Sequence, residues 1–123
     1  MLNFSVGQAS FHLAALSAGR FSVLTTLSVS VPVISDNIEE QGFGRICDGV
    51  YASGVPVLEL ENMPDKSCKT VSAHLQKIAN QSPTNAVILG CAGMINIGNK
   101  LQPDYQMILI DPAAAVKIVP ALI

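Results

Sequence analysis

The chain is poor in aromatic residues and in charge. Its 123 residues include no tryptophan, two tyrosines and four phenylalanines, and 13% of them are charged. The scarcity of aromatic side chains excludes an aromatic binding platform, and the apolar half of the composition excludes a disordered chain. An aliphatic core of this kind is typical of parallel sheets, which are buried on both faces. The length allows one domain over residues 1–123 and excludes a second full one.

Positive charge is scarce as well, and it is not gathered into a stripe. The formal net charge is −2, and the lysines are scattered over positions 66, 69, 77, 100 and 117. Because a nucleic-acid site needs clustered cations that neutralise phosphates, we predict no nucleic-acid partner.

Long uninterrupted apolar runs are also missing. The first 19 residues carry no full charge and so lack a basic start. Their apolar run is interrupted by Asn3, Gln8, Ser10 and His12. A signal peptide needs a basic start and an apolar core, and a membrane-spanning helix needs about 20 apolar residues in a row. We therefore expect a cytoplasmic protein with no membrane partner.

The three cysteines, Cys47, Cys68 and Cys91, form neither a disulfide framework nor a Cys-x-x-Cys metal motif. Widely spaced thiols in odd number are typical of reduced cysteines in a cytoplasm. His12 and His74 have no metal-ligand spacing either. We predict packed or surface roles for both histidines and no bound metal.

Four short apolar runs, separated by helix signals, predict buried strands. The runs are Phe21 to Leu27, Ile46 to Ala52, Ala86 to Cys91 and Met107 to Ile110. Helices are expected from a Ser30 cap to Gly42, from an Asp65 cap to Pro83, and from an Asp111 cap and Pro112 to about Pro120. This alternation predicts an α/β fold, a three-layer sandwich around a four-stranded parallel sheet.

Two further segments need separate treatment. Residues Gly7 to Ala18 predict a helix that is apolar nearly all round and that ends at Gly19. One sheet covers only one side of such a helix, so we expect a second chain or a missing lobe against the other. Val55 to Leu58 has the pattern of a strand, and Glu59 and Glu61 are expected in a solvated loop after it.

The most reactive candidate is Cys91, in the turn Gly90-Cys91-Ala92-Gly93-Met94 between a predicted strand and a stretch with helical character. Ligands of parallel sheets bind at such strand ends, and a helix N-terminus there favours the thiolate form of a cysteine. The residue pattern alone leaves an alternative, a buried cysteine that packs as a small hydrophobic side chain. Cys47 and Cys68 are expected away from this edge, in structural roles.

A family resemblance rests on four segments in order: Gly19 to Leu27, Val55 to Glu61, Ile88 to Met94 and Ile110 to Val116. From about Gly7 to its end, the chain resembles the hydantoin and allantoin racemases of the aspartate/glutamate racemase superfamily. The resemblance implies a flavodoxin-like lobe, the second of two similar α/β lobes that face each other across a cleft and each supply one cysteine. The first lobe has no counterpart in this chain, and Gln8 stands where the family pattern has a glutamate.

The resemblance also implies roles for the residues of the turn. Cys91 is expected to accept a proton from a tetrahedral carbon as a thiolate and to return one as a thiol. The backbone N–H groups of Ala92 to Met94 are expected to hold the carbonyl oxygen that becomes enolate-like. Gly90 and Gly93 allow backbone and substrate to approach closely.

Thr25 and Thr26 come at the end of a predicted strand, on the same edge as Cys91, and the resemblance makes them substrate contacts. The alternative is that one hydroxyl caps a turn and the other packs in the sheet.

Together these features predict a racemase of the hydantoin type that needs no cofactor and acts on a small molecule, such as a hydantoin, allantoin or an amino acid. A lone lobe has half a cleft, so we expect a homo-oligomer or a separate first-lobe chain. One alternative is a non-catalytic remnant that serves as an interaction module. Another is a single-cysteine decarboxylase or isomerase of the same superfamily.

Overall fold

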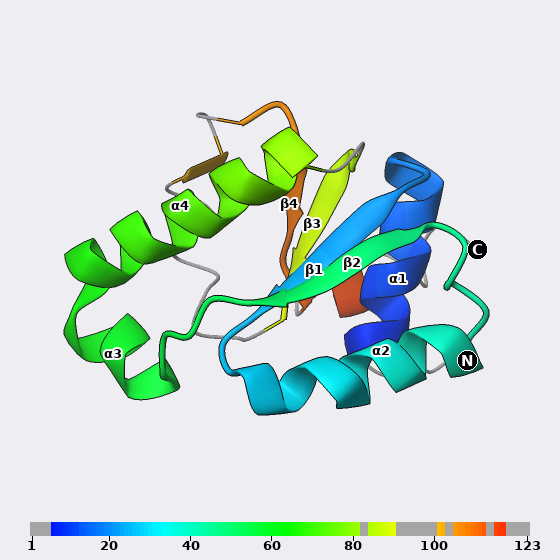
Figure 1. Cartoon of the computed structure of the whole chain (residues 1–123). Coiled ribbons are helices and arrows are strands. Elements are labelled where there is room, and N and C mark those ends of the chain that lie inside the picture. Colours follow the sequence, from blue (N-terminus) through cyan, green and yellow to red (C-terminus); the bar gives the residue numbers. More distant parts are fainter. Residues whose placement is uncertain (1–5, 82–83, 91–100, 103–104, 113–114, 118–123) are drawn as a thin grey trace.

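The computed structural model describes residues 6–81, 84–90, 101–102, 105–112 and 115–117. Figure 1 shows the strands in the middle, with α4 on one side and α1 and α2 on the other. The elements are α1 (Val6–Ser17), β1 (Phe21–Thr25), the 3₁₀ turn η1 (Ser28–Ser30), α2 (Val31–Glu40), β2 (Cys47–Ala52), α3 (Val57–Asn62), α4 (Pro64–Gln81), β3 (Ala86–Leu89) and β4 (Ile108–Ile110).

The four strands form one sheet in the order β2-β1-β3-β4, and every pair is parallel. Phe21 of β1 lies opposite Cys47 of β2 and Ala86 of β3, and Ala86 lies opposite Ile108 of β4. All carboxyl ends therefore meet at one edge of the sheet. The predicted α/β sandwich with a four-stranded parallel sheet is confirmed, although each strand is shorter than the apolar run that predicted it.

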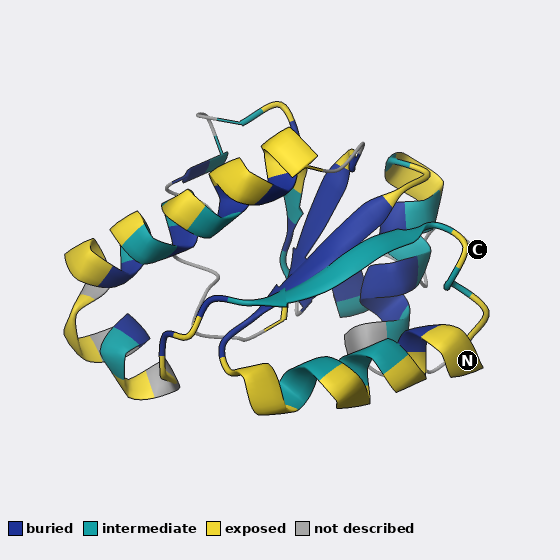
Figure 2. Cartoon of the chain, in the orientation of Figure 1, coloured by how far each residue is buried: buried dark blue, intermediate teal, exposed yellow. Residues whose placement is uncertain are grey.

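Apolar clusters cover both faces of the sheet, and Figure 2 shows the buried strands between them. One cluster joins the sheet to α3 and α4 and includes Leu24, Leu60, Val71, Leu75, Ile78, Val87 and Leu89. The other joins the sheet to α1 and α2 and includes Ala9, Phe11, Ala14, Phe21, Val23, Ile38 and Ile88. Successive residues of β1 and β3 thus face opposite layers, which explains why these strands read as continuous apolar runs.

α2 begins directly after Ser30 as predicted but lacks the predicted side-chain cap, α4 begins earlier than predicted, and the predicted end of α2 agrees with the structure. Ser30 makes no side-chain cap to α2, because its own backbone is already helical at the end of η1 (φ −80°, ψ −19°). α4 begins at Pro64, so Asp65 lies inside the first turn instead of capping it. Gly42 follows α2 with φ +84°, the left-handed conformation that glycine adopts most readily at a helix end.

The strand predicted at Val55 to Leu58 is wrong. The helix α3 starts directly after Pro56, whose extended backbone (φ −63°, ψ 151°) precedes it. Helical geometry buries Leu60 to 4% exposure in the cluster beneath α4, which outweighs the β preference of the valines. Glu59 and Glu61 therefore lie in a helix and not in a loop.

The first helix is buried on one side and open on the other. Ala9, Phe11 and Ala14 pack in the core, while Leu16 is 64% exposed. At the other end of the chain, Pro112 and residues 115–117 are helical, and the rest of the predicted last helix lies outside the described residues. No helix in the part of the chain that the structure describes has the length and apolarity to cross a membrane.

A polar network ties the strands together at the amino edge of the sheet. The Asp48 carboxylate, whose side chain is 5% exposed, forms a salt bridge with Arg20. Its other oxygen accepts a hydrogen bond from the Thr84 hydroxyl (Oγ1···Oδ2 2.6 Å). Because Thr84 has one proton and gives it to Asp48, the buried Ser22 hydroxyl donates to Thr84 (2.7 Å). The network links residues at the starts of β1 and β2 to the residue that leads into β3.

The outer edge of β4 is closed by a single side chain. The Gln102 amide donates to the Met107 carbonyl (2.9 Å) and accepts from the Leu109 N–H (2.7 Å). These two backbone groups face away from β3, since the N–H of Ile108 between them bonds to Asn85 on the β3 side (3.0 Å). Gln102 therefore pairs the backbone of an edge strand as a fifth strand would.

Candidate active site at the carboxyl edge of the sheet

Residues following β1, β2 and β3 are joined by backbone hydrogen bonds where these strands end. The Gly90 N–H donates to the Leu24 carbonyl at 2.8 Å. On the other side of β1, the Ser53 N–H donates to the Thr25 carbonyl (2.9 Å) and the Gly54 N–H to the Thr26 carbonyl (2.7 Å). Gly90 therefore lies beside the end of β1, at the carboxyl edge where Thr25 and Thr26 were predicted.

Both threonines are buried in this arrangement, with Thr25 3% and Thr26 7% exposed. The hydrogen bonds from Ser53 and Gly54 at this edge use the backbone carbonyls of the threonines and not their hydroxyls. Gly90 lies directly against Thr25, because a Cβ added at Gly90 would come within 3.3 Å of the Thr25 Cβ. A side chain at position 90 would thus crowd the end of β1. Packing is therefore a further reason for a glycine at this position.

Ser53 and Gly54 were missed by the sequence reasoning. The Ser53 hydroxyl contacts the Thr26 carbonyl (3.4 Å) and accepts from the Val55 N–H (3.3 Å). Gly54 has φ +76°, which allows the chain to turn back toward Thr26. A serine and a glycine immediately after a predicted strand are a turn signal that places residues at the ligand edge.

Cys91, Ala92, Gly93 and Met94 lie outside the described residues. Their predicted roles stay predictions, and they rest on the position of Gly90, which immediately precedes Cys91 in the chain and lies at the carboxyl edge.

The two described cysteines lie on different elements. Cys47 is the first residue of β2, at the amino edge of the sheet, as predicted. Burial raises the pKa of its thiol above the ordinary value of 9.0, and the negative charges of Asp48 and Glu39 raise it further. Cys68 lies in the second turn of α4, half-buried against the core. The prediction that Cys68 lies away from the carboxyl edge is wrong, because α4 starts directly after α3 and runs back toward the amino edge, where Gln76 and Ala79 near its end lie close to Thr84.

No metal centre is formed within the described ranges, where no three side chains of histidine, cysteine, aspartate or glutamate converge. His12 packs its ring edge-on against Phe43, with centroids 5.1 Å apart. His74 lies half-buried on α4. Both positions agree with packing roles for the histidines.

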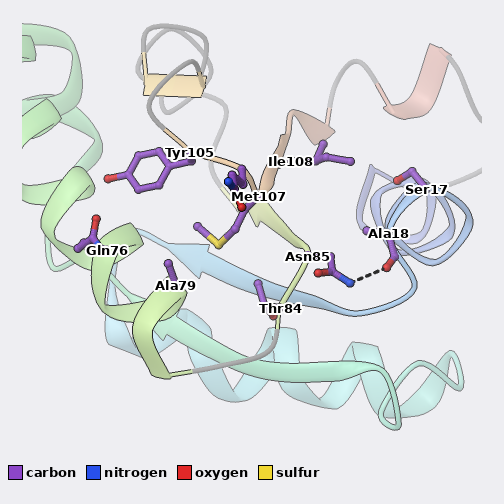
Figure 3. Close-up of a pocket in the computed structure, with 10 residues that line it drawn as sticks. Ser17, Ala18, Gln76, Ala79, Thr84, Asn85, Tyr105, Met107 and Ile108 are labelled. Atoms are coloured by element: carbon purple, nitrogen blue, oxygen red, sulfur yellow. Dashed lines mark hydrogen bonds between the residues drawn. The ribbon is translucent and has the colours of Figure 1, made fainter.

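A large cavity of about 640 Å³ lies at the opposite, amino edge of the sheet. Figure 3 shows Thr84 and Asn85 among its lining side chains, with Asn85 pointing toward Ala18. The Asn85 amide donates to the Ala18 carbonyl there (3.1 Å). Its described lining contains no cysteine, histidine or carboxylate, so it offers no proton-transfer group of the kind that the predicted reaction needs.

Comparison with known proteins identifies the family. The family model described as Asp/Glu/Hydantoin racemase matches residues 4–117. The chain belongs to the Asp/Glu/hydantoin racemase family. Among curated members, a hydantoin racemase of Rhizobium meliloti is 37% identical over 117 residues, which are 94% of this chain and 48% of that protein.

Solved racemase structures show the same fold. An allantoin racemase from Klebsiella pneumoniae superposes with a TM-score of 0.87 at 28% identity, over 97% of this chain and 49% of that one. An allantoin racemase from Pseudomonas fluorescens gives the same score and identity over 99% of this chain and 54% of that one. The chain thus spans about half the length of the racemases that it matches, which fits a single lobe of the family fold.

Proposed function

We propose that this chain is the second, cysteine-bearing lobe of a racemase of the hydantoin type, a single domain over residues 1–123 whose Cys91 transfers a proton without a cofactor. The observation that carries the proposal is the carboxyl edge, where Gly90 lies against Thr25 in a chain of this family. Cys91 follows Gly90 in the sequence, at the strand end where ligands of parallel sheets bind.

The reaction starts with removal of a proton from the ring carbon next to a carbonyl. The Cys91 thiolate forms an S–H bond with that proton, and the electron pair of the broken C–H bond moves onto the carbonyl oxygen. The N–H groups of Ala92 to Met94 hold this developing oxyanion. Gly90 and Gly93 leave room for the ring beside the backbone. The substrate class is a cyclic ureide or imide, following the hydantoin and allantoin named for its relatives.

Thr25 and Thr26 supply hydroxyls for the substrate ring. Their carbonyls are used by Ser53 and Gly54, which fixes the backbone of both threonines. The hydroxyls take no part in those bonds and offer donors and acceptors that suit the alternating carbonyl and N–H groups of a ureide. We propose that Thr25 and Thr26 orient the ring over Cys91.

Inversion needs a second group on the opposite face of the carbon, because one thiol returns its proton to the face from which it came. Of the other two cysteines, Cys47 lies at the opposite edge of the sheet, and Cys68 is half-buried against the core in α4. One lobe is thus expected to catalyse proton exchange with solvent and little or no inversion. A full site requires a second such group to face this edge, from the first lobe of the family fold or from a second copy of this chain.

Deuterium exchange tests this chemistry directly. The chain is incubated with an enantiopure 5-substituted hydantoin in deuterated water, and incorporation at C5 is followed by NMR alongside optical rotation. Wild type and the control Cys47→Ser are expected to exchange C5 at the same rate, and Cys91→Ser is expected to fall to the uncatalysed rate. Equal exchange by wild type and Cys91→Ser would refute the proposal. It would favour the alternative, a non-catalytic interaction module.

A further inference from the structure

The cavity at the amino edge of the sheet has a polar lining with no charged side chain among the described residues. Its volume of about 640 Å³ lies in the range of pockets that bind small organic molecules. The lining comes from the end of α1, the second half of α4 and the residues that lead into β3 and β4. The cavity therefore offers several polar groups to a small molecule, at the edge opposite the candidate active site.

One end of the cavity is formed by Tyr105 and Gln76 (Figure 3). The Tyr105 hydroxyl donates to the Ser72 carbonyl (3.0 Å) and lies 2.8 Å from the Ser72 hydroxyl, so the ring is held against α4. Gln76 lies one helical turn after Ser72, on the same face of α4. Its amide nitrogen donates to the Asn80 Oδ1 (3.2 Å), which leaves its Oε1 as an acceptor. A fixed aromatic ring and an amide oxygen thus lie at this end.

Two helices end at the cavity, and neither has a basic residue in its last turn. α1 ends at Ser17, which lines the cavity, and α4 ends at Gln81, three residues before the lining residue Thr84. The last carbonyls of a helix have no partner within the helix and carry the negative end of its dipole. The Asn85 amide covers one carbonyl, that of Ala18. The cavity therefore combines a negative potential with a lining that holds no carboxylate among the described residues.

These groups favour a guanidinium cation over other charged groups. A guanidinium is planar and weakly hydrated, stacks on aromatic rings and presents five N–H donors to carbonyl oxygens. An ammonium is compact and strongly hydrated, and an anion is repelled by the helix ends. Arg20 does not supply this cation itself. Its carbonyl accepts from the Asn85 N–H (3.3 Å), but its guanidinium is held in the salt bridge with Asp48.

We propose that the amino-edge cavity binds an alkylguanidinium compound. The guanidinium stacks on the Tyr105 ring and donates to the Gln76 Oε1, and the alkyl chain packs on Ala79 and Met107, which also line the cavity. A free alkylguanidine and an arginine side chain of another protein share this chemistry. The binding does not depend on the proposed racemase chemistry, because it uses the opposite edge of the sheet.

An NMR titration with butylguanidinium tests the site. The side-chain amide signals of Gln76 and Asn85 are followed, and butylammonium and butylurea serve as matched compounds that lack the planar group or the charge. Saturable shifts are expected with butylguanidinium, and affinities about tenfold weaker with both matched compounds. No shift, or equal affinity for all three compounds, would overturn the proposal. N-acetylarginine methylamide distinguishes the sources, since tighter binding than butylguanidinium assigns the site to an arginine side chain and weaker binding to a free alkylguanidine.

Charge substitutions at Gln76, which is exposed on α4, test the electrostatic part. Gln76→Lys places a cation at the cavity and should weaken butylguanidinium binding about tenfold, whereas Gln76→Glu should strengthen it about threefold. The control Asn37→Lys adds the same charge on α2, outside the cavity, and should change the affinity by less than about twofold. Wild-type affinity in Gln76→Lys would contradict the site.

A pair of substitutions at Tyr105 tests the ring. Tyr105→Leu should weaken binding about fivefold, because it removes the stacking surface. Tyr105→Phe loses the same hydrogen bonds to Ser72 but keeps the ring, and it should bind as wild type does. Circular dichroism checks that both variants are folded. Equal losses in the two variants would refute the stacking.

Discussion

Replacing Asp48 by alanine is the sharpest test of how the sheet is held at its amino edge. The buried carboxylate accepts one hydrogen bond from the Thr84 hydroxyl at 2.6 Å and another from the Arg20 Nε at 3.0 Å. Arg20 is 46% exposed, so water solvates it after the change and its pairing contributes at most about 1 kcal/mol. The charged, buried bond to Thr84 contributes more, about 1.5 kcal/mol. We expect Asp48→Ala to lower the free energy of unfolding by about 2 kcal/mol.

A double-mutant cycle isolates the bond between Asp48 and Thr84. Thr84→Val removes the hydroxyl at nearly constant volume and is expected to cost about 1.5 kcal/mol. The double variant should lose about 1 kcal/mol less than the sum of the single losses, because both changes delete the same bond. Urea unfolding followed by circular dichroism measures all three variants, since the chain has no tryptophan. Asp36→Ala, at an exposed carboxylate on α2, serves as the control and should change stability by less than about 0.5 kcal/mol. Losses that add fully, or an Asp48→Ala loss no larger than the control's, would refute the reasoning.

Three other substitutions have defined outcomes. Gly54→Ala should lower the free energy of unfolding by about 1 kcal/mol, because the φ of Gly54 is +76° and the space around an added methyl is open. It should also slow hydantoin exchange by shifting Thr26. The control Gly42→Ala, at φ +84° far from the site, should lower stability by the same amount and leave exchange unchanged. Because the pKa of Cys47 is raised in the folded state, the native protein holds that proton more tightly than the unfolded chain. Stability is therefore lost as pH rises from about 9 through the folded-state pKa. Cys47→Ser should flatten this decline of the unfolding free energy in urea titrations at pH 8 to 11. An unchanged dependence of stability on pH would count against the burial effect. Gln102→Met should leave the Met107 carbonyl and the Leu109 N–H without the Gln102 side chain and lower stability by about 1 to 2 kcal/mol. It should also promote aggregation, which light scattering measures. A variant as soluble and stable as wild type would contradict the role given to Gln102.

The layer architecture was predictable from the sequence because the chain alternates apolar runs with helix signals. β1 and β3 are buried on both faces, so their composition alone marked them as central strands of a parallel sheet. Strand ends were less predictable. Thr26 was included in the first strand, but its carbonyl bonds to Gly54 in a turn and not to a neighbouring strand. Apolar side chains continue past the point where ladder bonding stops.

Contacts between segments far apart in the chain could not be predicted from the sequence. Val55 to Leu58 has a strand pattern, but the helix that starts at Val57 buries Leu60 in the same core cluster as Val71 and Leu75 of α4. The approach of Thr25 to Gly90 followed from the rule that parallel strands end at one edge. The bond from Gly54 to Thr26 depends on a left-handed turn that the sequence signals only by its glycine.

The salt-bridged network at Asp48 and the candidate site at Thr25 and Thr26 lie at opposite edges of the same sheet. Side-chain bonding between the strands is thus concentrated at the amino edge, and the proposed ligand groups lie at the other. Because Thr25, Thr26 and Ser53 are buried, a library limited to small side chains at these three positions is expected to keep melting temperatures close to that of the parent while its preferred ring substituents diverge. Under the proposed function, substrate preference can then evolve with little change in thermal tolerance.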